Sequence, residues 1–329
     1  MNHRRWSPLF LEWVVVAGVT SARPWQGQRP VATDEPSPAH DPGCYLCPSV
    51  QRAAGARNPD YTGSFAFDND FSSFGSSDVP LSEGFAQTAG VGGICRVLCW
   101  SEQHNQTLAT LDEPAFEQVV ELLCAEYQTL SQRDDVAYVM MFENKGKEVG
   151  VSNLHPHGQI YATEYLPQRV QTLDRALREG QLADKTLWQQ LLEDPHWRGN
   201  IIEENEHFVH LLPWSARMPF ETMIVPKRAI PAQSQMTATE RKAYSQIWAS
   251  ALKRYDRFFG RSTPMISIHY NAPCDGRDLA HWHWFTLMQP PLRDAHTLKY
   301  LAGFETGGGD VVNPTLPEAA AQSLRETQP

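Results

Sequence analysis

The sequence predicts an α+β protein built from two related halves that share an extended antiparallel sheet. One order of segments occurs twice: two strand-like stretches, a helix-like stretch, then two more strand-like stretches. Each series ends in a histidine-rich strand, at 155–157 and at 281–283. Long antiparallel strands with helices packed on them define the α+β class. The 329 residues are ample for two units, which we expect to span 1–180 and 181–329.

The first half carries four strand-like segments and one helical segment. The expected strands are 9–17, 94–100, 136–142 and 154–162. The expected helix is 113–133, where six apolar side chains recur on one face: Phe116, Val119, Val120, Leu123, Cys124 and Tyr127.

The beginning of the chain has features of a secretory signal, because two arginines precede the apolar stretch and Thr20-Ser21-Ala22 follows it. Glu12 interrupts that stretch, and Val14, Val15 and Val16 are β-branched, so a core strand is the better interpretation. No run of residues approaches the roughly 20 apolar residues of a membrane-spanning helix. We therefore expect a reduced cytoplasmic setting and no membrane partner.

The second half repeats the pattern after a mostly helical connection over 166–197. Strands are expected at 207–212, 220–225, 265–269 and 282–288, with a long helix over 237–259. Thr237 and Glu240 form a capping-box pattern at the start of this helix.

The charge of the chain argues against a general nucleic-acid binder. The formal net charge is −10, whereas such proteins carry a basic patch or stripe. An acidic chain can still bind a nucleotide, because a few local donors are enough to hold phosphates.

The strongest local signal is the run from 152 to 159, Ser-Asn-Leu-His-Pro-His-Gly-Gln. Side chains at i, i+2 and i+4 of a strand share a face, so His155, His157 and Gln159 are predicted to point together. A neutral imidazole can attack phosphorus and form a covalent phosphoramidate, which divides a group transfer into two steps. The Gln159 amide can donate to a phosphate oxygen but cannot act as an acid or base. Two ordinary polar histidines are the alternative interpretation.

A second signal is the Cys44-Tyr45-Leu46-Cys47 pair, which belongs to a set of six cysteines in the chain. Two thiolates at this spacing suit one tetrahedral zinc ion, which needs two further ligands. The candidates in the first half are His40, His104, His155 and His157. By spacing alone, two unreactive thiols are an equal alternative.

Six short motifs occur in an order that resembles a known family. They are RPWQG at 23–27, CYLCP at 44–48, NPDYTG at 58–63, FENKG at 142–146, HPHGQ at 155–159 and PFET at 219–222. Each motif alone is weak, but the ordered set is specific. It resembles the galactose-1-phosphate uridylyltransferase family, a branch of the histidine-triad superfamily, over nearly the whole chain.

The resemblance implies two histidine-triad-like halves that form a half-barrel sheet, and a homodimer with shared active sites. His157 matches the family's nucleophile, and Gln159 stands where the hydrolase branches have a third histidine. The implied uridylyl-enzyme would therefore wait for a sugar phosphate rather than react with water. One zinc ion per chain is implied, with a supporting role rather than a Lewis-acid role, and its ligands match Cys44, Cys47, His104 and His155.

The resemblance also implies substrate contacts in three groups. The phosphate-contacting positions match Arg23, Asn144, Gly150, Ser152 and Gln159. The uridine-binding segment matches Phe67, Asn69 and Asp70. A C-terminal segment that reaches the sugar in the partner subunit matches Lys299, Phe304 and Glu305.

Some family members carry a second, iron-type metal site of one glutamate and three histidines. His269 matches the first histidine, but Leu173 stands at the glutamate position. Phe285 and Leu287 replace the other two histidines. Shifting the register towards His281 or His283 does not rebuild the ligand set, so we expect no second metal site.

Further departures from the family pattern lie around the sugar and the distal phosphate, so they bear on the identity of the acceptor substrate. Thr20 lies where many relatives have a second arginine, Phe304 replaces a tyrosine, and the segment 303–310 is rich in glycine.

The leading hypothesis is a uridylyltransferase that exchanges UDP-glucose and galactose 1-phosphate for glucose 1-phosphate and UDP-galactose. A related nucleotidyltransferase or nucleoside-diphosphosugar phosphorylase, using an adenine nucleotide sugar or inorganic phosphate, is the alternative. A third hypothesis is a catalytically silent, zinc-stabilised nucleotide-binding protein.

Overall fold

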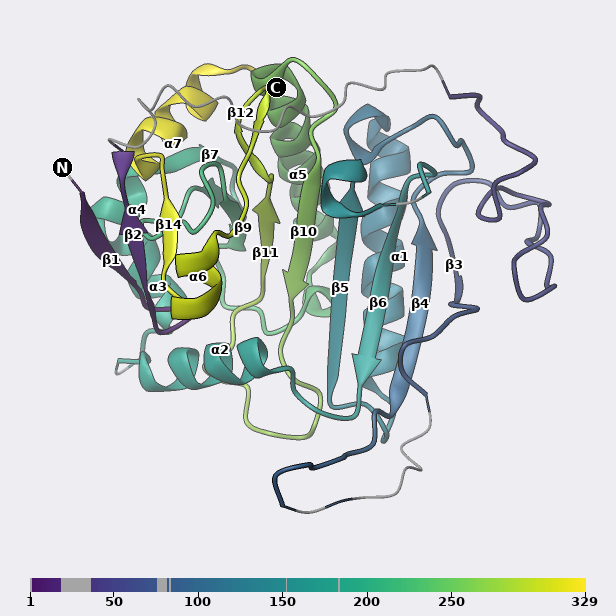
Figure 1. Cartoon of the computed structure of the whole chain (residues 1–329), viewed down its shortest axis with the longest axis horizontal. Coiled ribbons are helices and arrows are strands. Elements are labelled where there is room, and N and C mark those ends of the chain that lie inside the picture. Colours follow the sequence, from purple (N-terminus) through teal and green to yellow (C-terminus); the bar gives the residue numbers. More distant parts are fainter. Residues whose placement is uncertain (1, 19–36, 76–81, 83, 152, 183) are drawn as a thin grey trace.

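The centre of the protein is an antiparallel sheet that crosses the whole molecule (Figure 1). The computed structural model describes residues 2–18, 37–75, 82, 84–151, 153–182 and 184–329. Within them the sheet has nine strands, in the order β3 (Phe65–Asp68), β4 (Gly93–Cys99), β6 (His157–Thr163), β5 (Tyr138–Lys145), β10 (Met265–Tyr270), β11 (Phe285–Gln289), β9 (Thr222–Pro226), β8 (Phe208–Leu211) and β7 (Ile201–Glu204).

The two halves of this sheet repeat one arrangement. β3, β4, α1 (Glu113–Ser131), β5 and β6 follow one another in the first half, and β8, β9, α5 (Ala238–Phe259), β10 and β11 follow in the second. β5 and β10 lie side by side in the middle and join the halves by antiparallel pairing. The predicted α+β class is confirmed, and one order of elements does occur twice. The first strand of the first series is β3, however, and not the predicted strand 9–17. Residues 8–11 form a turn, so that β2 (Glu12–Val16) folds back on His3–Ser7 in a separate three-stranded sheet. The division at 180/181 stays a prediction, because the sheet runs across β5 and β10 without a break.

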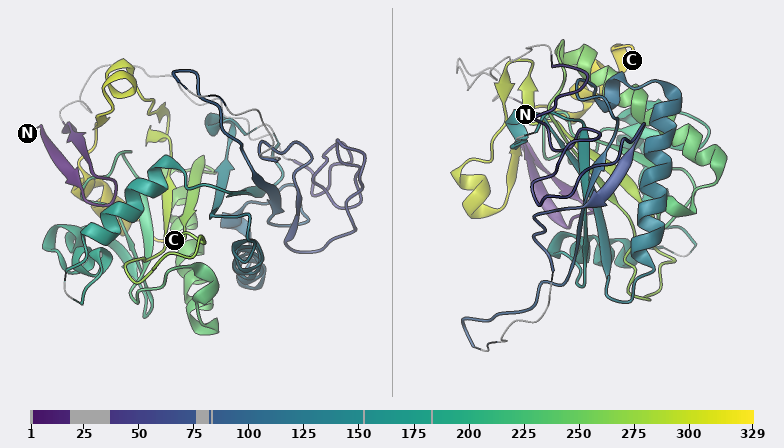
Figure 2. Two further views of the ribbon diagram at one scale, coloured as in Figure 1. Left: turned by 90° about the horizontal axis from the view of Figure 1, so that it is seen from below. Right: turned by 90° about the vertical axis from the view of Figure 1, so that its right-hand side faces the viewer.

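The long helices α1 and α5 cover one face of the sheet (Figure 2). Asp112 caps α1 by accepting the Ala115 N–H, and the capping box of Thr237 and Glu240 starts α5 as predicted. Gly260 ends α5 with φ 66°, a left-handed conformation that suits glycine. Between helices and sheet lies the larger apolar core.

The opposite face is covered over the second half of the sheet. The covering elements are α2 (Gln168–Glu179), α3 (Leu187–Glu193), α4 (Pro195–Gly199) and a small sheet of β1 (His3–Ser7), β2 (Glu12–Val16) and β14 (Val311–Asn313). They bury a second core that includes Leu173, Trp188 and Phe285. On the same face β4, β6 and β5 carry no helix among the described residues, so this part of the sheet stays open (Figure 1).

The remaining elements lie around the C-terminal part of the chain. They are β12 (Leu292–Asp294), β13 (Thr297–Leu298), α6 (Gly303–Gly308) and α7 (Pro317–Glu326). None of the helices that the structure describes combines the length and apolar character needed to cross a bilayer.

Glu143, on β5, is a carboxyl group buried between the sheet and the helices. It is 4% exposed, and its Oε1 accepts a hydrogen bond from the Trp100 indole N–H at 3.0 Å. Burial raises the pKa of Glu143 to about 7, because the charged form loses its hydration; Lys145 opposes this shift. The folded protein therefore holds the Glu143 proton more tightly than the unfolded chain does.

We expect Glu143→Gln to gain stability relative to the wild type as the pH rises. A carboxyl whose folded pKa is raised loses stabilisation between its unfolded pKa and its folded pKa, on the order of 3 kcal/mol in total for this shift. The neutral amide has no such loss. Thermal unfolding of both proteins between about pH 5 and pH 8 measures the difference, with the exposed Glu179→Gln as control. If the difference in stability between wild type and variant does not change with pH, the pKa of Glu143 is not raised in the folded protein.

Candidate functional site

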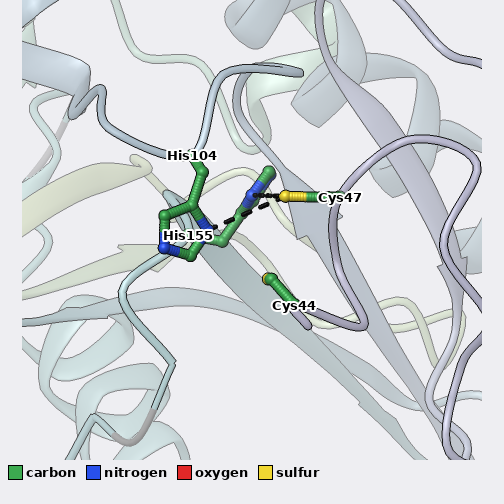
Figure 3. A group of neighbouring side chains, drawn as sticks. All are labelled: Cys44, Cys47, His104 and His155. Carbon is green, nitrogen blue, oxygen red and sulfur yellow. Dashed lines mark hydrogen bonds between the residues drawn. The ribbon is translucent and has the colours of Figure 1, made fainter. Parts of the chain in front are cut away.

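Four side chains from three separate segments gather beside the residues that precede β6 (Figure 3). They are Cys44, Cys47, His104 and His155, and one ligand atom from each lies within 4.8 Å of the others. The Cys47 Sγ lies 3.5 Å from His155 Nδ1 and 3.8 Å from His104 Nδ1. Each of the four is buried, with at most 7% exposure. In the part of the chain that the structure describes, no other group of three or more such residues meets this distance.

The donor chemistry of this Cys2His2 cluster fits a metal ion. The His155 Nε2–H donates to the Ser101 carbonyl at 2.9 Å, which leaves the Nδ1 lone pair directed at Cys47. Burial lowers the pKa of His155 to about 4 and also lowers the pKa of His104, so both rings are neutral, as a metal ligand must be. Burial raises the pKa of Cys47 to about 11, so a cation is needed to hold this thiol as thiolate.

Two neighbouring residues orient the cluster from outside. The Asn153 Oδ1 accepts the His155 backbone N–H at 2.9 Å, while its Nδ2 donates to Cys44 Sγ at 3.4 Å. The Tyr61 hydroxyl donates to the Leu46 carbonyl at 2.7 Å and lies 3.1 Å from His155 Nε2. Tyr61 and Asn153 lie inside motifs that the sequence analysis used, but spacing alone assigned them no role.

His157 begins strand β6 on the open face of the sheet. Partly exposed His157, Gln159 and Tyr161 alternate with buried Gly158 and Ile160, as a strand with one open face requires. The His157 Nδ1 lies 2.7 Å from the His155 carbonyl oxygen, which can only accept, so Nδ1 carries the proton. Nε2 therefore keeps its lone pair. Burial lowers the pKa of His157, so the neutral, nucleophilic form is favoured.

The prediction that His155 shares a face with His157 and Gln159 is wrong. β6 begins at His157, and the residues before it form a bend rather than a strand. The bend turns the His155 ring into the Cys2His2 cluster, where it is 1% exposed. The period of two holds for His157 and Gln159 only.

Strand register brings several predicted substrate residues onto the face that carries His157. Phe67 pairs with Val97, which pairs with Gln159, which pairs with Phe142, so these four form one row across β3, β4, β6 and β5. Continuing the β5–β6 register by two residues brings Asn144 opposite His157. Phe67 and Asn144 are thus brought to the candidate site.

Asn69 and Asp70 follow β3, but their side chains bond to nearby backbone. The Asn69 Oδ1 accepts from the Phe71 N–H, and the Asp70 carboxylate accepts from the Ala54 N–H at 3.2 Å. Arg52 links this segment to the sheet, because its guanidinium lies 4.5 Å from the Phe67 ring centroid and 3.6 Å from Asp70. Sequence reasoning missed Arg52, since one arginine in a loop gives no signal.

The remaining predicted contacts are not part of this row of strand residues or are not described. Gly150 is in the loop after β5 and adopts φ 85°. Arg23, Ser152 and Thr20 lie outside the described residues. In its own chain α6 lies beside β14 and β2, across the molecule from β6 (Figure 1).

We call residues 299–308, which include α6, the C-terminal arm. An ion pair within this segment holds it together. Lys299 Nζ lies 2.5 Å from Glu305 Oε1, and both residues are largely buried. Phe304 instead projects into solvent, with 63% exposure.

Three residues that match ligand positions of the family's second metal site are apolar in this chain. Leu173, Phe285 and Leu287 pack together with Tyr270 in the second core. His269 lies on the other face of the sheet, where its Nδ1 is 3.0 Å from Thr286 Oγ1 and its ring packs against Trp248.

The two remaining histidines have other partners. His281 bonds to Asp174 at 3.0 Å, and His283 bonds to the Pro226 carbonyl. Both precede β11, which begins three residues later than predicted.

Comparison with known structures agrees with this fold. The fold matches the crystal structure of an ADP-glucose phosphorylase from Arabidopsis thaliana with a TM-score of 0.80 at 21% identity, over 99% of this chain and 98% of that one. The fold class is therefore one that includes a nucleotide-sugar enzyme.

Sequence relatives narrow the class. A galactose-1-phosphate uridylyltransferase of Haemophilus influenzae is 35% identical over 98% of this chain and 93% of the relative. That of Thermotoga maritima is 32% identical over 100% and 99%. The models of the galactose-1-phosphate uridyl transferase N-terminal and C-terminal domains match residues 1–167 and 184–328. The chain belongs to the galactose-1-phosphate uridyl transferase family, as the ordered motifs predicted.

We expect Asn153→Ala to weaken metal binding by about 10-fold to 100-fold, because the variant loses the donor to Cys44 and the brace on His155 together. Transfer of Zn²⁺ from the protein to a chromophoric chelator measures this. Asn205→Ala is the matched control, since Asn205 accepts the His207 N–H in the same way far from the cluster. Equal metal retention in the two variants would show that Asn153 does not support the site.

Proposed function

We propose that this protein is a UDP-glucose:hexose-1-phosphate uridylyltransferase that works through a covalent uridylyl-histidine. The observation that carries the proposal is the His157 ring on the open sheet face: its Nδ1 is bound to the His155 carbonyl, and its Nε2 has no hydrogen-bond partner among the described residues. This geometry occurs in a chain that belongs to the uridyl transferase family over nearly its whole length.

In the first half-reaction the His157 Nε2 attacks the α-phosphorus of UDP-glucose. The phosphorus–oxygen bond to the β-phosphate breaks, and glucose 1-phosphate leaves with that oxygen. In the second half-reaction a phosphate oxygen of galactose 1-phosphate attacks the same phosphorus, which releases His157 and forms UDP-galactose. Gln159 and Asn144 supply neutral amide donors to the phosphate oxygens. We assign the base and ribose to the segment of Phe67, Asn69 and Asp70.

We propose that the cluster of Cys44, Cys47, His104 and His155 holds one zinc ion per chain. Two thiolates and two neutral imidazoles in a buried, closed site are the ligand set of structural zinc. When bound, the ion joins the Cys44–Cys47 loop to the residues just before β6 and so supports the strand that carries His157. The apolar packing of Leu173, Phe285 and Leu287 supports our expectation of no second metal site.

We further propose a homodimer in which the C-terminal arm serves the partner's site. The arm lies across the molecule from its own β6, and exposed Phe304 at 63% supports a contact beyond the chain. Arg23, Gly150 and Ser152 remain predicted phosphate contacts, and Lys299 and Glu305 predicted sugar contacts. A cytoplasmic location is supported by the six unpaired cysteines, all of which are described.

We expect His157→Gly to abolish the adduct and to lower transfer by at least about a thousandfold, because the covalent route is lost. Intact-protein mass spectrometry after mixing with UDP-glucose should show one added uridylyl group on the wild type and none on the variant. ADP-glucose is the matched donor. Labelling by ADP-glucose but not by UDP-glucose would favour the related phosphorylase, and absence of any adduct would favour a silent binding protein.

We expect Gln159→His to shorten the lifetime of the uridylyl-enzyme in buffer without sugar phosphate. A histidine here can act as acid and base for water, which is typically worth on the order of 10²–10⁴ in rate. The wild-type amide has no titratable group. Decay of the isolated adduct measures the effect. An unchanged lifetime would mean that exclusion of water, rather than Gln159, protects the intermediate.

A further inference from the structure

Gly158 lies between His157 and Gln159 and contacts Trp100 on the helical side of the sheet. A Cβ atom on Gly158 would lie 2.2 Å from Trp100 Cζ2 and 2.8 Å from Cη2. Real Cβ atoms do not approach so closely, so the indole packs directly against the strand backbone. Both candidate catalytic side chains therefore stand on a segment supported by one tryptophan ring.

Trp100 is fixed to its surroundings at two points. Its backbone N–H donates to the Pro156 carbonyl at 2.9 Å, one residue before His157. Its indole N–H donates to Glu143 Oε1 at 3.0 Å. Trp100 is 2% exposed, so water does not compete for the indole N–H. The position of the ring beneath Gly158 is thus determined by Pro156 and Glu143.

Strand register places Glu143 for this contact. Phe142 pairs with Gln159, so the next residue, Glu143, lies opposite Gly158. On its other side Glu143 pairs with Ser267 of β10. Among the described residues the Glu143 Oε2 and the Ser267 Oγ have no hydrogen-bond partner. In the part of the chain that the structure describes, the Trp100 indole is therefore the one group to which the Glu143 side chain is hydrogen-bonded.

Stability does not explain a carboxyl in this place. Lys145 acts on the Glu143 carboxyl as an opposite charge, but its ion pair is with Asp256, at 3.5 Å; no ion pair to Glu143 occurs among the described residues. A buried acid with one neutral partner costs more than an apolar residue of the same volume. The hydrogen bond of Glu143, however, is made to the Trp100 indole, which packs against Gly158 in β6, the strand that carries His157.

We propose that Glu143 is a positioning residue. By holding the Trp100 indole against Gly158, it fixes the position of the β6 backbone and so of the His157 and Gln159 side chains on the open face. This rests on the proposed function of His157. Group transfer is sensitive to such placement, since a shift of about 1 Å can cost about 10²-fold in rate. Donor binding, which depends on many contacts, is much less affected.

The test is the single-turnover rate of adduct formation from saturating UDP-glucose, followed by quenching and intact-protein mass spectrometry. Glu143→Ala and Trp100→Phe should be slower by about tenfold or more, with the donor concentration for half-maximal rate changed by less than about threefold. Glu143→Gln should retain the wild-type rate within about twofold, because its amide oxygen accepts the same hydrogen bond. Metal content is measured for every variant, so that loss of the cluster is recognised.

Trp282→Phe is the matched control. Trp282 is also fully buried, and its indole N–H donates to a buried carboxylate, Asp174 Oδ1, at 2.7 Å. This variant should lower the unfolding temperature without slowing adduct formation. Trp100→Phe keeps most of the ring volume and decides the question if Glu143→Ala does not fold.

Two outcomes overturn the positioning role alone: Trp100→Phe as fast as Trp282→Phe, or Glu143→Gln as slow as Glu143→Ala. In both the wild type still forms the adduct, so the proposed function stands. A wild type without adduct overturns the proposed function and this inference with it.

Discussion

Antiparallel pairing of β5 with β10 is the interaction on which the rest of the architecture depends. Five residue pairs, from Met265 opposite Lys145 to His269 opposite Met141, join the two halves into one sheet. The pairing brings α1 and α5 together on one face, where they share a single core. The pairing also makes the opposite faces of the two halves one continuous surface. The elements that cover this surface lie over the second half only, so the accessible part belongs to the first half.

The two halves use that opposite face differently. In the second half β10 and β11 present Tyr270, Phe285 and Leu287, and helices α2 to α4 bury them. In the first half β6 presents His157 and Gln159, and no described helix covers them. One repeated framework thus serves as a packing surface on one side of the β5–β10 pairing and carries the proposed reactive residues on the other. An apolar second half can stabilise the fold without limiting access to the first.

Periodicity and capping were enough to predict the α+β class, and helices α1 and α5 to within two residues. The repeated order was predicted with one wrong member, because the apolar stretch 9–17 stood as the first strand in place of β3. The Cys2His2 set came from the family resemblance, because spacing alone left four histidines open. The period-two argument failed for His155, since a bend held by Asn153 and Ser101 is invisible to a pattern of apolar residues. Arg52 and Trp100 were missed for a related reason: their roles depend on contacts with strand residues that are distant in sequence.

His155 takes part in the site through three different groups. Its ring faces Cys47, its N–H is bound by Asn153, and its carbonyl oxygen holds the proton on His157 Nδ1. The geometry of the Cys2His2 cluster and the tautomer of His157, the proposed nucleophile, are therefore not independent of one another. A change in the backbone at this one peptide would act on the geometry of the cluster and on the proton of His157 at the same time.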